Sequence, residues 1–556
     1  MEGAESGIDG APASEQSREA YDVLVIGGGV NGLATAWDAA TRGMSVLVID
    51  KGDWGSGTSS WSSRLVHGGL KYLEHLELGL VYESLRDREW LLQKAPHLVK
   101  PLPFLMPFYK SNQHSRWILR LGMLVYDVLS FGKSVPNHRV LSAKQALALA
   151  PGLRQDGLQG AGRYYDAQVE FAERLCIELL LGAQAAGAVT RNHTAAVSLV
   201  REGSRVSGAV LVDAITGAER TVHARVVINA AGPWIDEVLA GSPMGSERLN
   251  GGTKGTHLVV RRFAGGPSTD CVYYEARSDG RQVLVIPWDG RYLIGSTDKR
   301  FAGDLDRAQP DQDEVDYILA ETNLAFPAAA LSADDVEYAY TGVRPLPYVP
   351  TGDVGKITRK HIIHSHGPDF AGLFTVIGGK LTTFRTLGEH AADRAAKMLG
   401  VRERSHTRAF TLPGARGDLA AAGARVASLL PGLAKSAVAR LVTLYGTRAV
   451  EVAEFAIESG DTAQLGATFA LRAEVVFGIR FEQAVHVQDV LARRTMLGLE
   501  ADLGLGVLDD VVDLMGDELG WSPSRREQEA SAYLTYLERL TLTEEGHRIG
   551  AVLPGH

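Results

Sequence analysis

Residues 22–50 read DVLVIGGGVNGLATAWDAATRGMSVLVID. An apolar run at 23–26 leads into a glycine turn, a helical stretch follows at 33–42, and a second apolar run ends at Asp50. A dinucleotide-binding βαβ unit requires this order of strand, glycine turn, helix, strand and terminal acid. A glycine-rich turn in an ordinary α/β domain would leave the acid unexplained, so the sequence predicts a dinucleotide cofactor.

The residues of this turn have separate physical roles. Gly27 permits the tight turn, Gly29 lets the backbone approach a pyrophosphate, and Gly32 lets the helix pack closely on the strand. Asn31 lies in the same turn, where the helix N-terminus points unpaired N–H groups at an anion. Asp50 is placed to accept hydrogen bonds from a ribose.

Length, composition and net charge limit the classes of protein to which this chain can belong. The chain has 556 residues, 45% of them hydrophobic and 22% charged, which suits a soluble globular protein of two to four domains. A net charge of −9 argues against nucleic acid as a partner. Cys176 and Cys271 form no metal-ligand or disulfide pattern, and we predict no metal site. Residues 1–20 are small and polar, so we expect a disordered segment rather than a signal peptide.

No run is long and apolar enough to predict a membrane-spanning helix. Residues 117–131 come closest, but Arg120 and Asp127 interrupt the run and basic residues flank it. This stretch could lie in a membrane interface. A helix of the protein core is the interpretation that we favour.

The chain predicts an α/β protein with a discontinuous Rossmann-like domain. A buried strand that ends in a glycine turn is expected within 225–234, another strand and turn within 373–383, and a helix from about 384 to 399. Alternating patterns such as those at 256–260, 282–286 and 292–294 predict a second, β-rich cap domain. The tail is rich in Ala, Leu, Glu and Arg at helical spacing. We therefore assign 21–100, 181–240 and 345–405 to the cofactor domain, 101–180 and 241–344 to a substrate-binding cap, and 411–556 to a C-terminal helical domain.

Three further segments suit the cofactor. The serine-rich loop that follows Asp50 offers hydroxyls and N–H groups, although a surface loop could have the same composition. Gly232 lies in a second glycine turn, which ends the strand expected within 225–234, and a third turn precedes the helix at 384–399. The partial positive charge of that helix N-terminus would stabilise a reduced flavin. The residues concerned are Thr58, Ser59, Ser62 and Ser63 in the loop, and Gly378, Gly379, Lys380, Leu381 and Thr382 in the third turn.

A histidine and several cations are candidates for catalysis and substrate binding. In RLVHGGLKYL, His67 could move a proton near neutral pH, and Lys71 and Tyr72 could contact an anionic substrate. Arg344 precedes a proline, which holds its backbone extended and lets its side chain fork onto a phosphate or carboxylate. Lys254, His257 and Arg359 are further candidates. A lone histidine is more often structural, and a lone cation is usually a solvated surface charge.

The separated blocks IGGGVNG, TSSWSSRLVHGGLKYLEH, NAAGPW, TKGTHLVV, IPWDG, GSTD, TGVRPLP and GGKLTTFR resemble the FAD-dependent glycerol-3-phosphate dehydrogenases. The resemblance runs from about residue 21 into the C-terminal domain. One residue departs from the family pattern. Many relatives carry arginine where Lys71 stands, and lysine keeps the charge but loses the planar fork.

The resemblance implies oxidation of sn-glycerol 3-phosphate to dihydroxyacetone phosphate, with hydride passing to FAD and electrons leaving to a respiratory quinone. It implies a cytoplasmic protein associated peripherally with the inner face of the cell membrane, and it leaves room for a homodimer. It suggests His67 as the base, Arg344, Lys71 and Arg359 as the phosphate clamp, Lys254 and His257 as helpers, and Lys380 as the stabiliser of reduced flavin.

Other enzyme classes remain open at this point. An oxidase of the same fold that uses oxygen would share nearly every block, and an amine or amino-acid oxidase could pair a substrate carboxylate with Arg344. A flavin-binding scaffold without turnover and a nicotinamide dehydrogenase are weaker alternatives.

Overall fold

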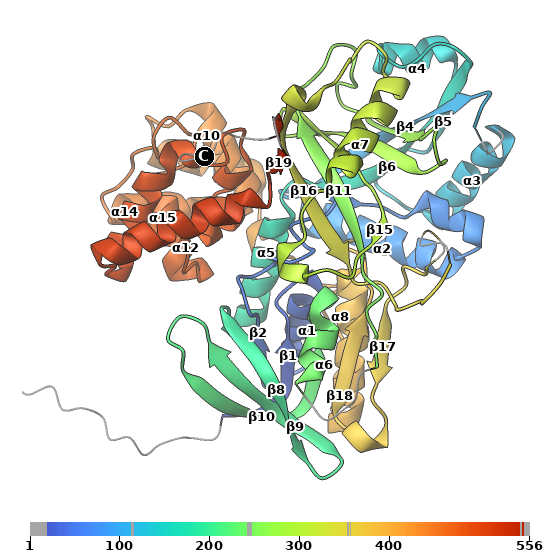
Figure 1. Cartoon of the computed structure of the whole chain (residues 1–556). Helices are drawn as coiled ribbons and strands as arrows, with labels where there is room; N and C mark the ends of the chain where they lie inside the picture. The colour runs from blue at the N-terminus through green and yellow to red at the C-terminus, as the bar shows by residue number, and fades with distance from the viewer. Residues whose placement is uncertain are drawn as a thin grey trace, which may run out of the picture.

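Two large sheets and a helical C-terminal domain make up most of the fold of this computed structural model (Figure 1). The structure describes residues 19–112, 116–241, 247–352, 355, 357–544 and 547–549. The first 18 residues, where we predict disorder, lie outside the described residues.

The first sheet has the strand order β17-β18-β10-β1-β2-β7, and its central strands are parallel. Parallel strands covered on both faces read as continuous apolar runs, and β1 and β2 are apolar for that reason. On one face α1, α5 and α8 pack together over the sheet, and on the other lie α6 and the β8–β9 hairpin. The strands are β1 (Ala20–Ile26), β2 (Val46–Ile49), β7 (Val189–Arg191), β8 (Thr194–Glu202), β9 (Arg205–Asp213), β10 (Glu219–Asn229), β17 (Ile362–Ser365) and β18 (Leu373–Ile377). The helices are α1 (Val30–Thr41), α5 (Ala172–Ala185), α6 (Ile235–Ala240) and α8 (Phe384–Leu399).

The expected strands and helices of this region are present, with shifted ends. Helix α1 begins at Val30, inside the glycine turn, three residues before the expected start. The proposed boundary between residues 180 and 181 falls inside α5. That helix packs against α1, because nearly all of its residues are buried in the same core cluster. The cap therefore ends before α5 and not at residue 180.

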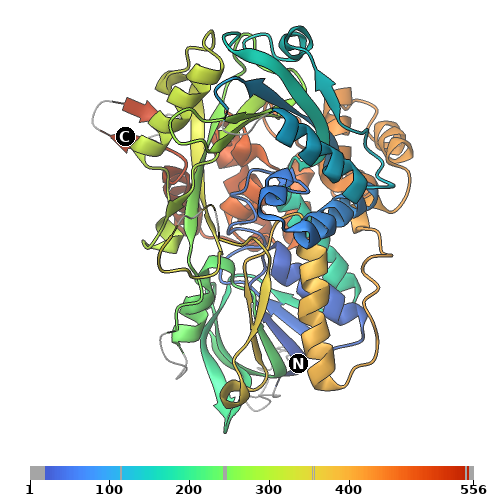
Figure 2. The same ribbon diagram turned by 90° about the vertical axis from the view of Figure 1, so that its right-hand side faces the viewer.

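The second sheet stands above the first and is mainly antiparallel (Figure 2). Its order is β15-β11-β14-β13-β12-β4-β6-β3, with β16 beside β11 and β5 beside β6. The strands are β3 (Leu65–Val66), β4 (Val99–Tyr109), β5 (Arg139–Leu141), β6 (Leu158–Val169), β11 (Thr253–Val260), β12 (Cys271–Glu275), β13 (Gln282–Trp288), β14 (Arg291–Gly295), β15 (Lys299–Arg300) and β16 (Val336–Arg344). The helices are α2 (Leu78–Lys94), α3 (Arg116–Leu129), α4 (Ala143–Leu149) and α7 (Gln312–Ala325), and the 3-10 helix η1 covers Leu70–His75. The short β3 leads directly into the HGG segment, which places that segment at the border of the two sheets.

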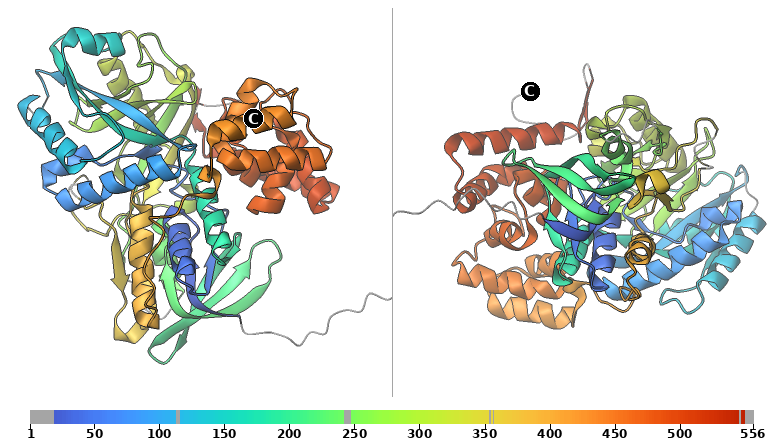
Figure 3. Two further views of the ribbon diagram at one scale, coloured as in Figure 1. Left: turned by 180° about the vertical axis from the view of Figure 1, so that it is seen from behind. Right: turned by 90° about the horizontal axis from the view of Figure 1, so that it is seen from below.

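The C-terminal region is helical, as its composition predicts, and it forms a separate lobe (Figure 3). Its helices are α9 (Leu419–Leu429), α10 (Lys435–Tyr445), α11 (Ala449–Glu458), α12 (Arg472–Glu482), α13 (Val487–Asp489), α14 (Leu508–Leu519) and α15 (Pro523–Glu538), with a π-helical turn at Val490–Arg494. Two short strands, β19 (Leu542–Glu544) and β20 (His547–Ile549), follow; the sequence pattern does not predict them.

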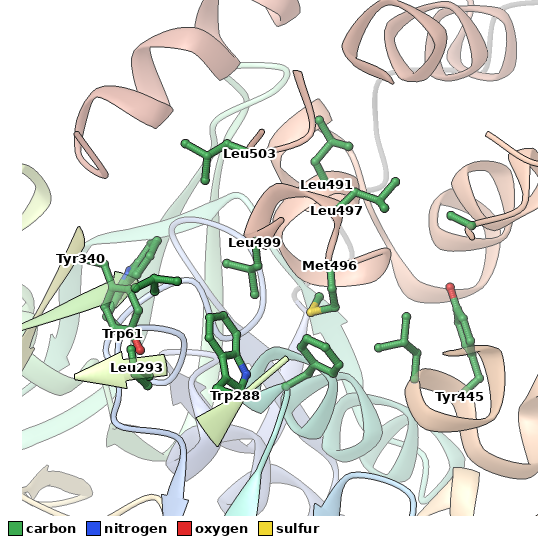
Figure 4. Packing of buried hydrophobic residues seen from close by; sticks show 14 of the residues in the cluster. Trp61, Trp288, Leu293, Tyr340, Tyr445, Leu491, Met496, Leu497, Leu499 and Leu503 are labelled. Atoms are coloured by element: carbon green, nitrogen blue, oxygen red, sulfur yellow. The ribbon is translucent and has the colours of Figure 1, made fainter. Parts of the chain in front are cut away.

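Apolar packing joins this lobe to the rest of the molecule. Figure 4 shows Trp61, Trp288 and Tyr340 facing Met496 and Leu499 of the C-terminal domain. These side chains belong to one continuous cluster of buried residues that crosses the boundary between the two parts. The lobe is therefore docked on the cofactor loop and on the cap sheet.

Buried ion pairs lie across the same boundary. Glu482 accepts from Arg174 of α5 at 2.5 and 2.9 Å, and Asp53 accepts from Arg494 at 2.7 and 2.8 Å. The pKa of Glu482 is lowered to about 2, because its arginine partners outweigh the effect of burial. Breaking one partner of such a buried pair leaves an uncompensated charge, so these contacts hold the lobe in a defined position.

Helix α3 differs from our expectation of a core helix. Its inner face is buried through Met123 and Tyr126, but its outer face is apolar and open to solvent. Leu121 is 62% exposed and Val128 is 67% exposed, and Phe131 just beyond the helix is 97% exposed. No helix among the described residues is both long and apolar enough to cross a bilayer.

Candidate active site

A cavity of about 610 Å³ opens at the carboxyl ends of β1 and β2. This is the edge at which open parallel sheets bind their ligands. The cavity is lined by the first glycine turn, the serine-rich loop, the end of β10 and the third glycine turn, and also by residues of the C-terminal domain. Of the predicted cofactor residues, those on its wall are Gly27, Gly29, Asn31, Asp50, Thr58, Ser59, Ser62, Gly232, Gly379, Lys380 and Leu381.

The first turn is built as its glycines predict. A Cβ atom on Gly32 would lie 1.8 Å from the carbonyl oxygen of Gly27, so only glycine allows this approach of helix to turn. Gly27 itself has φ +109°, which favours glycine. The backbone N–H of Val30, at the start of α1, donates to Ser59 Oγ at 3.1 Å. The serine-rich loop and the helix N-terminus therefore converge on one point of the cavity.

Asp50 stands at the end of β2 on the wall of this cavity. Its carboxylate accepts from the backbone N–H groups of Gly28 at 2.6 Å and Gly52 at 2.8 Å. Burial raises the pKa of Asp50, although the two N–H groups oppose that effect. The carboxylate is held in place and faces the cavity, as a ribose ligand requires.

Two polar atoms on the cavity wall have no hydrogen-bond partner within the described part of the chain. They are Asn31 Oδ1 and Trp234 Nε1, and both are buried. A buried polar group without a partner is costly, so such atoms mark where a ligand supplies the missing bonds. Together with the anion-binding turn and the ribose acid, they fit a flavin dinucleotide.

The other predicted cofactor residues act beside the cavity. Ser63 Oγ lies 2.7 Å from His257 Nε2, and Thr382 Oγ1 accepts from the backbone N–H of His67 at 3.1 Å. Gly378 has φ +78° and shapes the third turn. These residues orient the side chains around the cofactor site, and any direct cofactor contact from them stays a prediction.

His67 and Tyr72 meet the third glycine turn. The Tyr72 ring stacks on the His67 ring with centroids 6.4 Å apart. Lys380 lies with its Nζ 4.7 Å from the centroid of Tyr72 and 2.8 Å from Ser84 Oγ. The fold thus brings together three of the predicted residues, although 313 positions separate His67 from Lys380.

Two arginines share one carboxylate next to these residues. Asp298 accepts from Arg344 at 2.9 Å and from Arg359 at 3.1 Å. Burial would raise the pKa of Asp298, but the two guanidinium groups hold it below its usual value. Burial raises the pKa of Tyr72, and the charges of Arg359 and Arg344 act on the same phenol. Glu77 also acts on this phenol and Lys380 lies against the ring, so three cations face two carboxylates and the net charge beside Tyr72 is positive.

The position of Arg344 depends on Gly255 of the neighbouring strand. Arg344 pairs with Thr253 across β11 and β16, and its Nη2 donates to Ser296 Oγ at 2.8 Å. A Cβ atom on Gly255 would lie 2.1 Å from Arg344 Nη2. The glycine thus leaves the space in which the guanidinium lies.

Lys254 does not belong to this cationic group, which corrects our prediction. It lies on β11 with its Nζ 2.6 Å from Asp311 and 2.9 Å from the buried Glu314 of α7. Successive side chains of a strand point to opposite faces, so Lys254 faces α7 while Gly255 faces Arg344. Its charge is compensated there, and we withdraw it as a substrate ligand.

His257 is also unsuited to the cationic role predicted for it. Its ring is buried and stacks on Tyr340, and burial with the nearby Arg344 and Arg64 lowers its pKa to about 3. A neutral imidazole cannot pair with a phosphate as a cation. The side chain of Lys71 lies outside the described residues, so its role stays a prediction.

The sequence did not predict some residues of the site. Asp298 stands in the GSTD block, which was recognised without a role for its acid. Arg493, Tyr536 and Arg539 line the cofactor cavity from the C-terminal domain. No sequence motif marks them, because their position depends on how that domain docks.

Comparison with known proteins agrees with this geometry. The model of the FAD dependent oxidoreductase family matches residues 22–394, and that of the C-terminal domain of alpha-glycerophosphate oxidase matches residues 405–526. A glycerol-3-phosphate dehydrogenase of Synechocystis is 41% identical over 94% of this chain and 98% of its own length. The chain belongs to the FAD-dependent glycerol-3-phosphate dehydrogenase family.

Other members of the glycerol-3-phosphate dehydrogenase family extend this match. The aerobic glycerol-3-phosphate dehydrogenase of Staphylococcus saprophyticus is 31% identical over 91% of this chain and 92% of its own length. The crystal structure of the Bacillus halodurans glycerol-3-phosphate dehydrogenase complexed with FAD superimposes with a TM-score of 0.75 at 29% identity, covering 95% of this chain and 96% of that one. The predicted fold class, enzyme class and FAD cofactor are thereby confirmed.

Proposed function

We propose that this chain oxidises sn-glycerol 3-phosphate to dihydroxyacetone phosphate and passes the electrons to a respiratory quinone. The observation that carries the proposal is the pair Arg344 and Arg359 around Asp298, whose charges act on Tyr72. Tyr72 stacks on His67 and contacts Lys380, which lines the FAD cavity. A net cationic pocket beside a histidine suits a phosphorylated alcohol better than an amine. It is a weaker fit to an amino acid, whose carboxylate carries less charge.

The chain's own side chains supply binding and proton transfer. Arg344 and Arg359 would hold the phosphate in a bidentate manner and so orient the C2 carbon. His67 would accept the proton of the C2 hydroxyl as the alcohol is oxidised. Lys380, at the turn before α8, would place positive charge near the site of reduction. Bound FAD supplies the two-electron acceptor for this oxidation.

The decisive test is anaerobic reduction of the purified yellow protein. Glycerol 3-phosphate is expected to bleach the visible absorption of the oxidised flavin, as about one equivalent per bound flavin reacts. Glycerol at the same concentration should reduce the flavin far more slowly, and simple amino acids should leave the spectrum unchanged. Bleaching by amino acids instead of glycerol 3-phosphate would contradict the proposal and indicate an amino-acid oxidase.

The electron acceptor separates a dehydrogenase from an oxidase of the same fold. With glycerol 3-phosphate and air alone, we expect slow oxygen uptake and little hydrogen peroxide. Adding a soluble quinone should restore fast turnover. Fast peroxide formation without quinone would favour the oxidase.

The outer face of α3 and the neighbouring η1 region are proposed to rest on the inner face of the membrane, where the quinone is dissolved. The face carries exposed Leu121, Leu124, Val128 and Phe131, and a basic amphipathic helix of this kind can lie in a membrane interface. Leu76, the residue just after η1, is 80% exposed and extends the apolar surface. A cytoplasmic location and a homodimer remain predictions from the family resemblance.

A double substitution tests this surface. Leu121→Glu with Val128→Glu is expected to reduce binding to phospholipid vesicles about tenfold or more, because each exposed side chain would lose roughly 1 kcal/mol of apolar burial in the bilayer. Cosedimentation with vesicles measures the change. The pair Ile457→Glu and Phe469→Glu, exposed apolar residues of the C-terminal domain, is the matched control. Equal losses for the two variants would argue against α3.

A further inference from the structure

The last long helix of the C-terminal domain ends beside the FAD cavity. Tyr536, and Arg539 just after the end of α15, line this cavity together with the glycine turn and the serine-rich loop. The guanidinium of Arg539 lies 4.6 Å from the ring centroid of Trp61, which belongs to that loop. A side chain from the far end of the chain therefore contributes to the wall of the cofactor site.

Arg539 differs from the neighbouring Arg493 in its partners. Arg493 donates to Asp53 and to Asp489, each at 2.6 Å, so its charge is compensated. Within the described part of the chain, the guanidinium of Arg539 has ring contacts with Trp61 and Tyr536 but neither a hydrogen bond nor an ion pair. A partly buried guanidinium without an anion is costly, so an absent anionic partner is indicated.

The nearest acids are already engaged. Asp306 acts on Arg539 only at a distance, and its carboxylate is bound by Lys51 at 2.8 and 2.9 Å. Burial lowers the pKa of Arg539, yet arginine stays charged in proteins. The open side of Arg539 is the cavity itself.

FAD has one anionic group, its diphosphate. The Trp61 indole N–H donates to the carbonyl oxygen of Ser56 at 3.0 Å, and Ser59 of the same loop contacts the N-terminus of α1. The serine-rich loop that contacts Arg539 through Trp61 is thus the same loop that contacts the anion-binding turn through Ser59. We propose that Arg539 binds the diphosphate of FAD, so that the C-terminal domain completes the cofactor site.

Cofactor affinity of the apoprotein tests this proposal without reference to turnover. R539Q is expected to raise the Kd for FAD about 10- to 100-fold, the loss typical of a hydrogen bond to a charged group. R526Q, in the first turn of the same helix where Arg526 pairs with Asp513 and Asp517 of α14, should leave the Kd unchanged. Quenching of flavin fluorescence on titration of the apoproteins measures both.

Fragments of the cofactor identify the group that is bound. ADP carries the diphosphate and adenosine does not. R539Q should therefore weaken the binding of ADP and leave the affinity for adenosine unchanged. An unchanged Kd for FAD, or equal weakening of ADP and adenosine, would overturn the proposal. If R539Q apoprotein fails to fold, R539K decides: lysine lacks the planar fork, so FAD should bind at least about threefold more weakly, and unchanged affinity would overturn the assignment.

Discussion

Replacement of His67 by Asn is expected to lower kcat about 10²- to 10⁴-fold while the protein stays yellow. General-base catalysis typically contributes a factor of this size. His67 lies against Tyr72 and beside Thr382 of the third glycine turn, outside the wall of the dinucleotide cavity, so FAD binding should survive. Steady-state turnover with an artificial quinone, normalised to bound flavin, measures the effect.

A matched histidine controls for the loss of a ring. His223 lies in the middle of β10, where it pairs with the first residue of β1, and it does not line the cavity, so His223→Asn should leave turnover unchanged. Anaerobic stopped-flow reduction of the flavin shows whether the chemical step is slowed. Turnover of His67→Asn within about threefold of the wild type, far below the range that general-base catalysis supplies, would rule out the base assignment.

Replacement of Arg344 by Gln is the second substitution for which we expect a large loss of activity. We expect kcat/KM for glycerol 3-phosphate to fall about 10- to 100-fold, because a hydrogen-bonded charge pair with the phosphate contributes roughly 1.5–3 kcal/mol. The slow oxidation of glycerol should hardly change, because glycerol has no phosphate. The pKa of Asp298 is lowered, so its carboxylate stays ionised across the neutral range. Titration of Asp298 therefore does not affect the comparison of the two substrates at neutral pH.

Two further variants test whether the position of the Arg344 guanidinium matters and whether the effect is specific to this cation. Gly255→Ala places a Cβ where the guanidinium lies and should reproduce part of the loss with Arg344 still present. Lys254→Gln removes a cation that faces α7, and it should lower thermal stability without changing the ratio of the two substrates. Equal losses for glycerol 3-phosphate and glycerol in Arg344→Gln would remove Arg344 from the phosphate site.

The parts of the site that the sequence predicts are those with a short-range signature. Gly27, Gly32 and Asp50 lie within one βαβ unit, where turn geometry, close packing and strand ends follow from local spacing. The helix before Gly400 and the apolar strands of the first sheet were predictable for the same reason. The motif that contains Lys254 does not indicate which face of β11 its side chain occupies, and the structure pairs that side chain with Asp311 and Glu314.

The amino-acid sequence by itself determined the cofactor class, the discontinuous Rossmann-like domain and the helical tail, since periodicity and glycine spacing act within a few residues. Only the tertiary structure decided that Asp298 joins Arg344 to Arg359, that α3 turns an apolar face outward, and that Arg539 reaches the FAD cavity. These features depend on side chains far apart in the chain whose meeting is set by how the sheets and the C-terminal lobe pack. Their contacts are long-range, and a single sequence carries no local pattern for them.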